Sequence, residues 1–170
     1  MEKRHTVLIV DDTPDSIEIL EGVLNDSYII TAARSGRMAL KIAEKTLPDI
    51  ILLDIVMPEM DGYDVCRRLK SNPLTKAIPI IFISAKDDAV NEARGLEVGA
   101  VDYITKPISA AIVLSRVKTH LALYDQTRTL EIQVAKATRE IMETRVEIIR
   151  RLGIAAEFRN NETGMHIYRV

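Results

Sequence analysis

The sequence has a single cysteine, no surplus of one charge and no long apolar run, and each shortage excludes a class of protein. Cys66 is the only cysteine in 170 residues, so an internal disulfide framework and a cysteine-rich zinc site are excluded. One free thiol also suits the reducing cytosol. The 23 basic and 25 acidic residues give a net charge of -2, which disfavours a nucleic-acid binder held by a basic surface.

Membrane and secretory segments are also missing from the pattern of apolar residues. No apolar run approaches the roughly 18 residues that a membrane helix needs. The apolar stretch that follows the basic start at residues 1–4 is too short for a signal peptide. With 47% hydrophobic and 28% charged residues, the composition is typical of a soluble globular domain with an appendage. We therefore expect a cytoplasmic protein with no membrane and no nucleic-acid partner.

Five short apolar runs, rich in valine and isoleucine, recur through the first 107 residues. They lie at residues 7–10, 28–32, 50–53, 80–83 and 101–104. The runs at 7–10, 50–53 and 80–83 are continuously apolar rather than alternating, which is typical of parallel strands buried on both faces, and the runs at 28–32 and 101–104 are weaker. Amphipathic stretches separate the runs, so the order of elements predicts a doubly wound α/β sheet with helices on both faces.

The amphipathic stretches carry recognisable helix signals. Pro14 suits the first turn of one helix, and Ser35 can cap the next. Further helices are expected at residues 61–70 and 87–98, and another from about residue 108. The residues expected to face the core in the first two helices are Ile17, Leu20, Leu24, Met38, Ile42 and Ala43.

The last third of the sequence has no glycine or proline between Pro107 and Gly153, which allows one long helix. From Leu123 the apolar residues follow alternating steps of four and three, as in a coiled-coil heptad. The a positions are Thr127, Val134, Ile141 and Ile148, and the d positions are Leu123, Leu130, Ala137 and Thr144.

This seam favours a homodimer. Branched residues at a with leucine at d favour a parallel two-stranded coil, and Glu140 could pair with Arg145 of a second chain. The alternative is one amphipathic helix lying on its own domain. We prefer the coil because the domain before it already has all its elements.

Polar residues stand at the carboxyl ends of the predicted strands. Asp11 and Asp12 end the first strand, Asp54 the third, Ser84 the fourth, and Lys106 follows the fifth. Ligands of open α/β sheets bind at these ends, so the groups converge if the strands are neighbours. Three carboxylates repel unless a cation compensates, and Mg²⁺ prefers such oxygens. The set predicts a Mg²⁺ site with an aspartate able to form an aspartyl phosphate, although each residue alone also has an ordinary structural role.

Four motifs carry a resemblance to a known family. VLIVDD, IILLDIVMPEMDG, IIFISA and GAVDYITKP resemble the receiver domain of two-component response regulators, over residues 5 to about 123. The resemblance implies a flavodoxin-like five-stranded parallel sheet of order 2-1-3-4-5, here with a long C-terminal helical extension. It also implies phosphotransfer from a sensor histidine kinase.

The same resemblance implies roles for the acidic residues. Asp54 is the phosphoacceptor, and Asp12, Asp54 and the backbone carbonyl of Val56 bind Mg²⁺. Asp11 helps to hold the ion through water. Val56 and Lys86, each two positions from a site residue, can tune the access of water to the phosphoryl group.

The remaining implied roles concern contact with the phosphoryl group and the response to it. Lys106 contacts the phosphoryl group, and the Lys106–Pro107 peptide is cis. Ser84 is the switch hydroxyl and Tyr103 the switch aromatic. Phosphorylation adds charge and acceptor oxygens, so Ser84 can move inward and leave space for Tyr103. The fourth helix and the fifth strand are then the surface that changes.

Residues 147–170 resemble the opening of an HD-GYP domain, a cyclic di-GMP phosphodiesterase, through RRLG, AAEFRNNETG and the next histidine. In that family the glutamate and histidine matching Glu162 and His166 belong to a metal site, and on a helix they share a face. Two ligands cannot complete the site, so this chain should have no phosphodiesterase activity. Gly164 and the polar run before it are expected to interrupt the helix.

The expected organisation is a receiver domain at 1–123, a coiled-coil linker at 124–152 and a truncated HD-GYP-like start at 153–170, a fragment of a larger protein. One alternative is a receiver that acts alone through protein–protein contacts. Another is a Mg²⁺ phosphatase of the haloacid-dehalogenase type, but that family places two aspartates two apart at its first strand, whereas Asp11 and Asp12 are adjacent. DNA binding is disfavoured because the arginines of residues 139–151 alternate with glutamates.

Overall fold

The computed structural model describes the backbone of residues 4–84 and 97–167, and the side chains within those ranges as far as residue 156. The chain forms two compact units, Met1–Asp125 and Gln126–Val170. The helix expected at residues 87–98 lies almost entirely outside the described residues.

The first unit is built on a five-stranded parallel sheet of order β2-β1-β3-β4-β5, as predicted. Every residue of β3 and β4 is buried, which explains why those two runs are continuously apolar. The strands are β1 (Thr6–Val10), β2 (Ile29–Ala33), β3 (Ile50–Asp54), β4 (Ile80–Ser84) and β5 (Asp102–Thr105).

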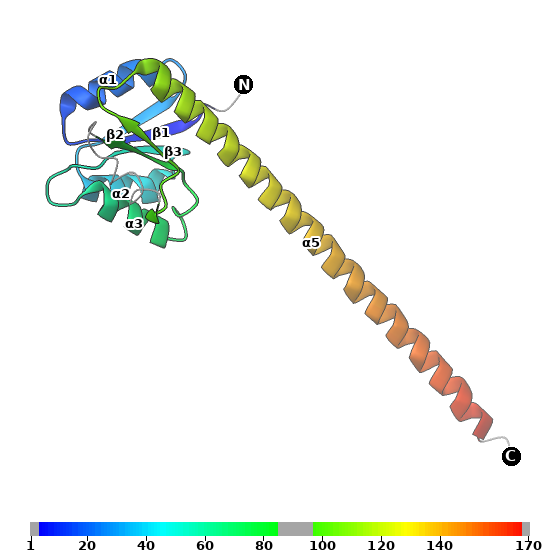
Figure 1. Ribbon diagram of the computed structural model, residues 1–170. Helices are drawn as coiled ribbons and strands as arrows, with labels where there is room; N and C mark the ends of the chain where they lie inside the picture. The colour runs from blue at the N-terminus through cyan, green and yellow to red at the C-terminus, as the bar shows by residue number, and fades with distance from the viewer. Residues whose placement is uncertain (1–3, 85–96, 168–170) are drawn as a thin grey trace. The chain divides into compact units, whose positions relative to one another are not determined.

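Helices cover both faces of the sheet (Figure 1). On one face, α2 (Gly36–Thr46) and α3 (Gly62–Ser71) pack over a core that includes Phe82. On the other, α1 (Pro14–Leu24) packs beside the first turns of α5 (Ala110–Ile167), which contribute Val113, Val117 and Leu121. The doubly wound architecture is therefore confirmed, and it directs the carboxyl ends of all five strands to one edge.

The phase of α2 differs from the prediction at one residue. The Ser35 side chain accepts a hydrogen bond from the backbone N–H of Met38, so the predicted cap is present. Met38 itself is 46% exposed, and the prediction that it faces the core is wrong. The buried stripe consists of Gly36, Ala39 and Ala43, and Met38 lies one position to the side of it.

The long helix α5 continues further than predicted. Its 58 residues include Gly153 and Gly164, so the expected interruption near Gly164 is wrong. An interior glycine costs about 1 kcal/mol relative to alanine, which by itself is too little to end a helix. The side chains of residues 126–156 are exposed. Among the described residues, no helix combines the length and the apolarity required to cross a membrane.

Candidate functional site

Three carboxylates meet at the carboxyl edge of the sheet. Asp54 is the last residue of β3, and Asp11 directly follows the neighbouring strand β1. One carboxylate oxygen each from Asp11, Asp12 and Asp54 lies within 4.8 Å of the others. Asp11 and Asp54 are buried and Asp12 is half-buried, so two of the three charges are removed from bulk water.

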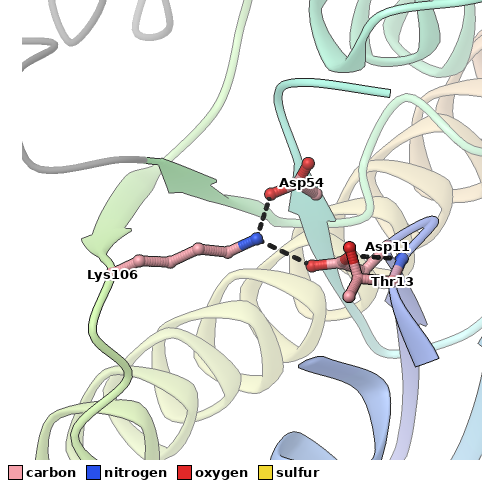
Figure 2. A network of polar contacts seen from close by, with 4 residues as sticks. All are labelled: Asp11, Thr13, Asp54 and Lys106. Atoms are coloured by element: carbon pink, nitrogen blue, oxygen red, sulfur yellow. Dashed lines mark hydrogen bonds and ion pairs between the residues drawn. The ribbon is translucent and has the colours of Figure 1, made fainter. Parts of the chain in front are cut away.

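Lys106 joins two of these carboxylates (Figure 2). Its Nζ donates to Asp54 Oδ1 at 2.7 Å and to Asp11 Oδ2 at 3.0 Å. The residue follows β5, which is separated from β3 by β4, so its side chain reaches across a strand to make these contacts. Lys106 is therefore tied into the site, with 32% of its side chain exposed, and does not extend freely into solvent.

Asp11 has a structural role as well as a place in the site. Its Oδ1 accepts a hydrogen bond from the backbone N–H of Thr13 at 2.8 Å, just before α1, while Oδ2 accepts from Lys106 (Figure 2). Both oxygens are thus engaged. Helix α1 begins with Thr13 as its N-cap residue and has no side-chain cap, so Asp11 does not cap it; the bond to Thr13 instead fixes the orientation of the Asp11 carboxylate.

Burial and charge shift the pKa values of Asp54 and Lys106. Burial raises the pKa of Asp54; the hydrogen bond and charge of Lys106 oppose this, whereas Asp11 and Asp12 add to it, and the pKa lies above its ordinary value. Burial alone would lower the pKa of Lys106, but its bonds to Asp54 and Asp11 outweigh burial and raise it. Three carboxylates thus face one ammonium, a surplus of negative charge that a divalent cation would neutralise.

Ser84 contributes a buried hydroxyl to the same edge. It ends β4, between β3 and β5, and its Oγ has no hydrogen-bond partner among the residues that the structure describes. Leaving a buried hydroxyl unpaired costs about 1–3 kcal/mol. A donor held at this cost at the end of the strand next to β3 fits an acceptor at this edge, such as a phosphoryl oxygen on Asp54.

The other predicted site residues lie on β5, just after β3, or outside the described residues. Tyr103 is half-buried on the edge strand β5 and packs against the core under α2 and α3. Val56, two residues after Asp54, is 72% exposed. The Lys106–Pro107 peptide is cis, as the resemblance implied. The predictions for Lys86 and for the Glu162 and His166 side chains lie outside the described residues.

Sequence reasoning missed Gly62, the first residue of α3. Its N–H donates to the carbonyl oxygen of Ile55 at 2.8 Å, and the preceding Asp61 caps the helix by accepting from the N–H of Asp64. A Cβ at Gly62 would lie 2.3 Å from the backbone carbonyl oxygen of Asp54. The start of α3 therefore lies directly against the backbone that carries the central carboxylate. The adjacent Asp61–Gly62 pair was the only sequence signal for this approach.

Comparison with known proteins identifies relatives of this chain. The family described as response regulator receiver domain matches residues 7–118. A probable cyclic di-GMP phosphodiesterase of Vibrio cholerae is 43% identical over 171 residues, covering 96% of this chain and 39% of that protein. The response regulator PleD of Caulobacter vibrioides is 44% identical over 114 residues, covering 66% and 25% respectively.

A solved structure supports the same fold. The crystal structure of a putative response regulator from Chloroflexus aurantiacus matches with a TM-score of 0.69 and 42% sequence identity, covering 71% of this chain and 99% of that chain. The described part of the first unit therefore has the same fold as that chain. The present chain spans less than half the length of the two curated relatives.

Proposed function

This chain belongs to the response regulator receiver domain family, and we propose that its Asp54 accepts a phosphoryl group from a sensor histidine kinase. One observation carries the proposal: the buried Asp54 carboxylate accepts a hydrogen bond from the Lys106 ammonium and lies close to two further carboxylates, while the Ser84 hydroxyl, at the end of the neighbouring strand, has no partner among the described residues. A receiver domain needs a nucleophile, a charge that screens the incoming phosphoryl group and a donor for its oxygens. These residues supply all three.

The proposed transfer moves the phosphoryl group from the kinase histidine to Asp54. A carboxylate oxygen of Asp54 forms a bond to phosphorus while the bond between phosphorus and the kinase histidine nitrogen breaks, and that electron pair returns to the imidazole. Repulsion between the anionic carboxylate and the phosphoryl oxygens opposes the approach. Lys106, at 2.7 Å from Asp54, reduces the repulsion and can follow the phosphoryl oxygens, to which Ser84 can also donate.

The acidic cluster fits Mg²⁺, which receiver domains bind through such residues. Asp11, Asp12 and Asp54, with the backbone carbonyl of Val56, are the residues that would hold the ion. Mg²⁺ takes oxygen ligands, usually from one or two carboxylates, and keeps several waters. When bound, it would neutralise the surplus negative charge beside the phosphoryl oxygens.

We propose that Ser84 and Tyr103 report the phosphorylation. Phe82 pairs with Tyr103 and Ser84 with Thr105 in the parallel ladder, so Ser84 and Tyr103 lie on the same face of the sheet. If Ser84 turns toward a phosphoryl group on Asp54, the space it leaves lies on the face where the Tyr103 ring packs. Val56 and Lys86 would tune the access of water and so the lifetime of the phosphoryl group.

The test is labelling by a small phosphodonor, acetyl phosphate, with Mg²⁺ present. The wild-type chain should gain the mass of one phosphoryl group, and Asp54→Asn should gain none, because an amide is not a nucleophile of this kind. Intact mass spectrometry measures both, and chelation of Mg²⁺ should suppress the wild-type signal. Asp64→Asn, an exposed carboxylate on α3 that pairs with Arg67, is the matched control and should label normally. Undiminished labelling of Asp54→Asn would place the acceptor elsewhere.

The second unit supports a proposal about output. Five seam residues of α5, Leu123, Leu130, Val134, Ile141 and Ile148, are 51–64% exposed. We propose that they pair with the same residues of a second chain in a parallel coil, with Glu140 facing Arg145 of the other chain. The signal from Asp54 would then pass through a dimer.

The relative from Vibrio cholerae, whose similarity covers 96% of this chain, is described as a probable cyclic di-GMP phosphodiesterase. We propose that the coil leads to an output domain of the HD-GYP type, because residues 147–170 resemble the opening of such a domain. Glu162 and His166 would be the first of its metal ligands. The present chain holds too few ligands for the reaction. Hydrolysis of cyclic di-GMP by this chain alone would contradict the proposal.

A further inference from the structure

Asp102, on the edge strand β5, is the centre of a polar network outside the phosphorylation site. Its carboxylate accepts hydrogen bonds from Arg116, from the backbone N–H of Tyr103 at 2.8 Å, and from His120 Nε2 at 2.9 Å. Arg116 and His120 both belong to the first turns of α5. The Asp102 side chain is 17% exposed, so these bonds form largely out of water. They fix the first turns of α5 to β5.

Arg116 also contacts the residue next to Asp102. Its guanidinium carbon lies 5.8 Å from the centroid of the Tyr103 ring, within the range of a cation–π contact. Neighbouring residues of a strand point to opposite faces, so Asp102 faces α5 while Tyr103 faces the core under α2 and α3. Because β5 is the edge strand, one arginine can reach both side chains by passing around that edge.

We infer that Arg116 is a positioning residue that holds the Tyr103 ring at the sheet edge and couples its movement to the first turns of α5. The inference rests on the proposed function, in which Tyr103 turns inward after Asp54 is modified. The guanidinium is anchored by Asp102, so the ring must leave a fixed cation when it moves. The contact therefore stabilises the conformation described here and opposes the switched conformation, in which Tyr103 has turned inward.

The size of this restraint sets the expected effect. A partly exposed cation–π contact changes an equilibrium by about two- to fivefold. A ligand that favours the switched conformation must overcome it, so removing the contact lowers the ligand concentration needed for half-saturation by the same factor. Beryllofluoride with Mg²⁺, a stable mimic of a phosphoryl group on an aspartate, is such a ligand.

The experiment is a calorimetric titration of the full chain with beryllofluoride in Mg²⁺. Arg116→Met should lower the half-saturation concentration about two- to fivefold relative to wild type. Arg116→Lys, which keeps the charge but loses the planar guanidinium, should fall between the two. His120→Gln is the matched control: it alters a bond to Asp102 without touching Tyr103, and should leave the half-saturation concentration unchanged.

A double-mutant cycle separates positioning from a general loosening of the fold. In a Tyr103→Ala background, Arg116→Met should have no further effect, because the ring on which it acts is gone. The same fold-change in both backgrounds, or no change in either, would overturn the inference while leaving Asp54 as the acceptor. Failure of the wild-type chain to bind beryllofluoride would instead overturn the proposed function, and the inference with it.

Discussion

Gly62 shows how a residue without a side chain can hold the proposed phosphorylation site in place. Its Cβ position lies 2.3 Å from the carbonyl oxygen of Asp54 and 2.9 Å from the Cα of Ile55, both of them backbone atoms that cannot rotate away. Gly62→Ala must therefore displace either α3 or the end of β3. We expect a loss of about 1–3 kcal/mol in the free energy of unfolding, measured in urea, and slower labelling of Asp54 by acetyl phosphate.

Gly22 is the matched control for this prediction. It lies in α1, and a Cβ there would meet no atom within 4 Å. Gly22→Ala should raise the free energy of unfolding by up to about 1 kcal/mol, because alanine is the better helix former, and should leave labelling unchanged. If both substitutions had the same effect, the close approach to Asp54 would not be the reason for the glycine.

The site residues differ in how far the sequence could predict them. Asp11, Asp54 and Lys106 could be placed together because each stands at the end of a predicted strand, and parallel strands bring those ends to one edge. Among the described residues the Ser84 hydroxyl has no partner, and the Gly62 backbone lies against that of Asp54. Both features depend on differences of tenths of an ångström in the spacing of separate elements. No local pattern of residues encodes such distances.

At the scale of the element, the first turns of α5 are attached to β5 by charged hydrogen bonds as well as by apolar packing. Burial alone would raise the pKa of Asp102, but the bonds from Arg116, His120 and the Tyr103 N–H, with the charge of Arg116, lower it below its ordinary value of 3.8. A carboxylate whose pKa is lowered on folding stabilises the protein above its unfolded pKa. That contribution disappears as the pH falls through the lowered, folded value.

Asp102→Asn should therefore destabilise the protein in a pH-dependent way. At neutral pH we expect a loss of about 1–3 kcal/mol in the free energy of unfolding, as for hydrogen bonds to a charged group. The difference from wild type should shrink once the pH falls below 3.8 and Asp102 begins to be protonated in the wild-type protein. Urea unfolding of both chains at neutral pH and at about pH 3 measures this difference.

Asp64→Asn serves as the control for the pH series. Asp64 pairs with Arg67 on the same helix, and both side chains are about half exposed, so the pair should contribute less than about 1 kcal/mol at any pH. A pH-independent loss in Asp102→Asn would mean that the residue acts through packing and not through its charge.

The start of a helix could be predicted where periodicity and a capping residue agree. The burial of a single residue and the end of α5 could not. The Ser35 cap predicts the start of α2 correctly. The apolar side chain of Met38 predicts burial, but the buried residues of α2 are Gly36, Ala39 and Ala43, and Met38 is exposed. The helix α5 continues past the predicted interruption because one glycine weakens a helix by only about 1 kcal/mol, which is too little to end it.

At the scale of the whole molecule, the proposed seam of α5 is the feature that would decide whether the chain acts as a monomer or a dimer. Val134 occupies an a position of the predicted heptad and is 64% exposed, while Ile132, two residues earlier, is 62% exposed and lies at f, on the opposite side of the helix. The two residues thus have the same exposure and similar apolarity, but only one belongs to the seam.

Val134→Glu should therefore dissociate the proposed dimer, whereas Ile132→Glu should not. In a parallel coil, residues at equivalent a positions face each other, so Val134→Glu would remove two buried apolar groups and oppose two negative charges in the seam. We expect the dimer dissociation constant to rise about a hundredfold or more, measured by sedimentation equilibrium over a range of chain concentrations. An exposed charge at residue 132 should change it by less than about threefold. A wild-type chain that sediments as a monomer throughout would contradict the coil, and equal effects of both substitutions would mean that the chains associate through another face of α5.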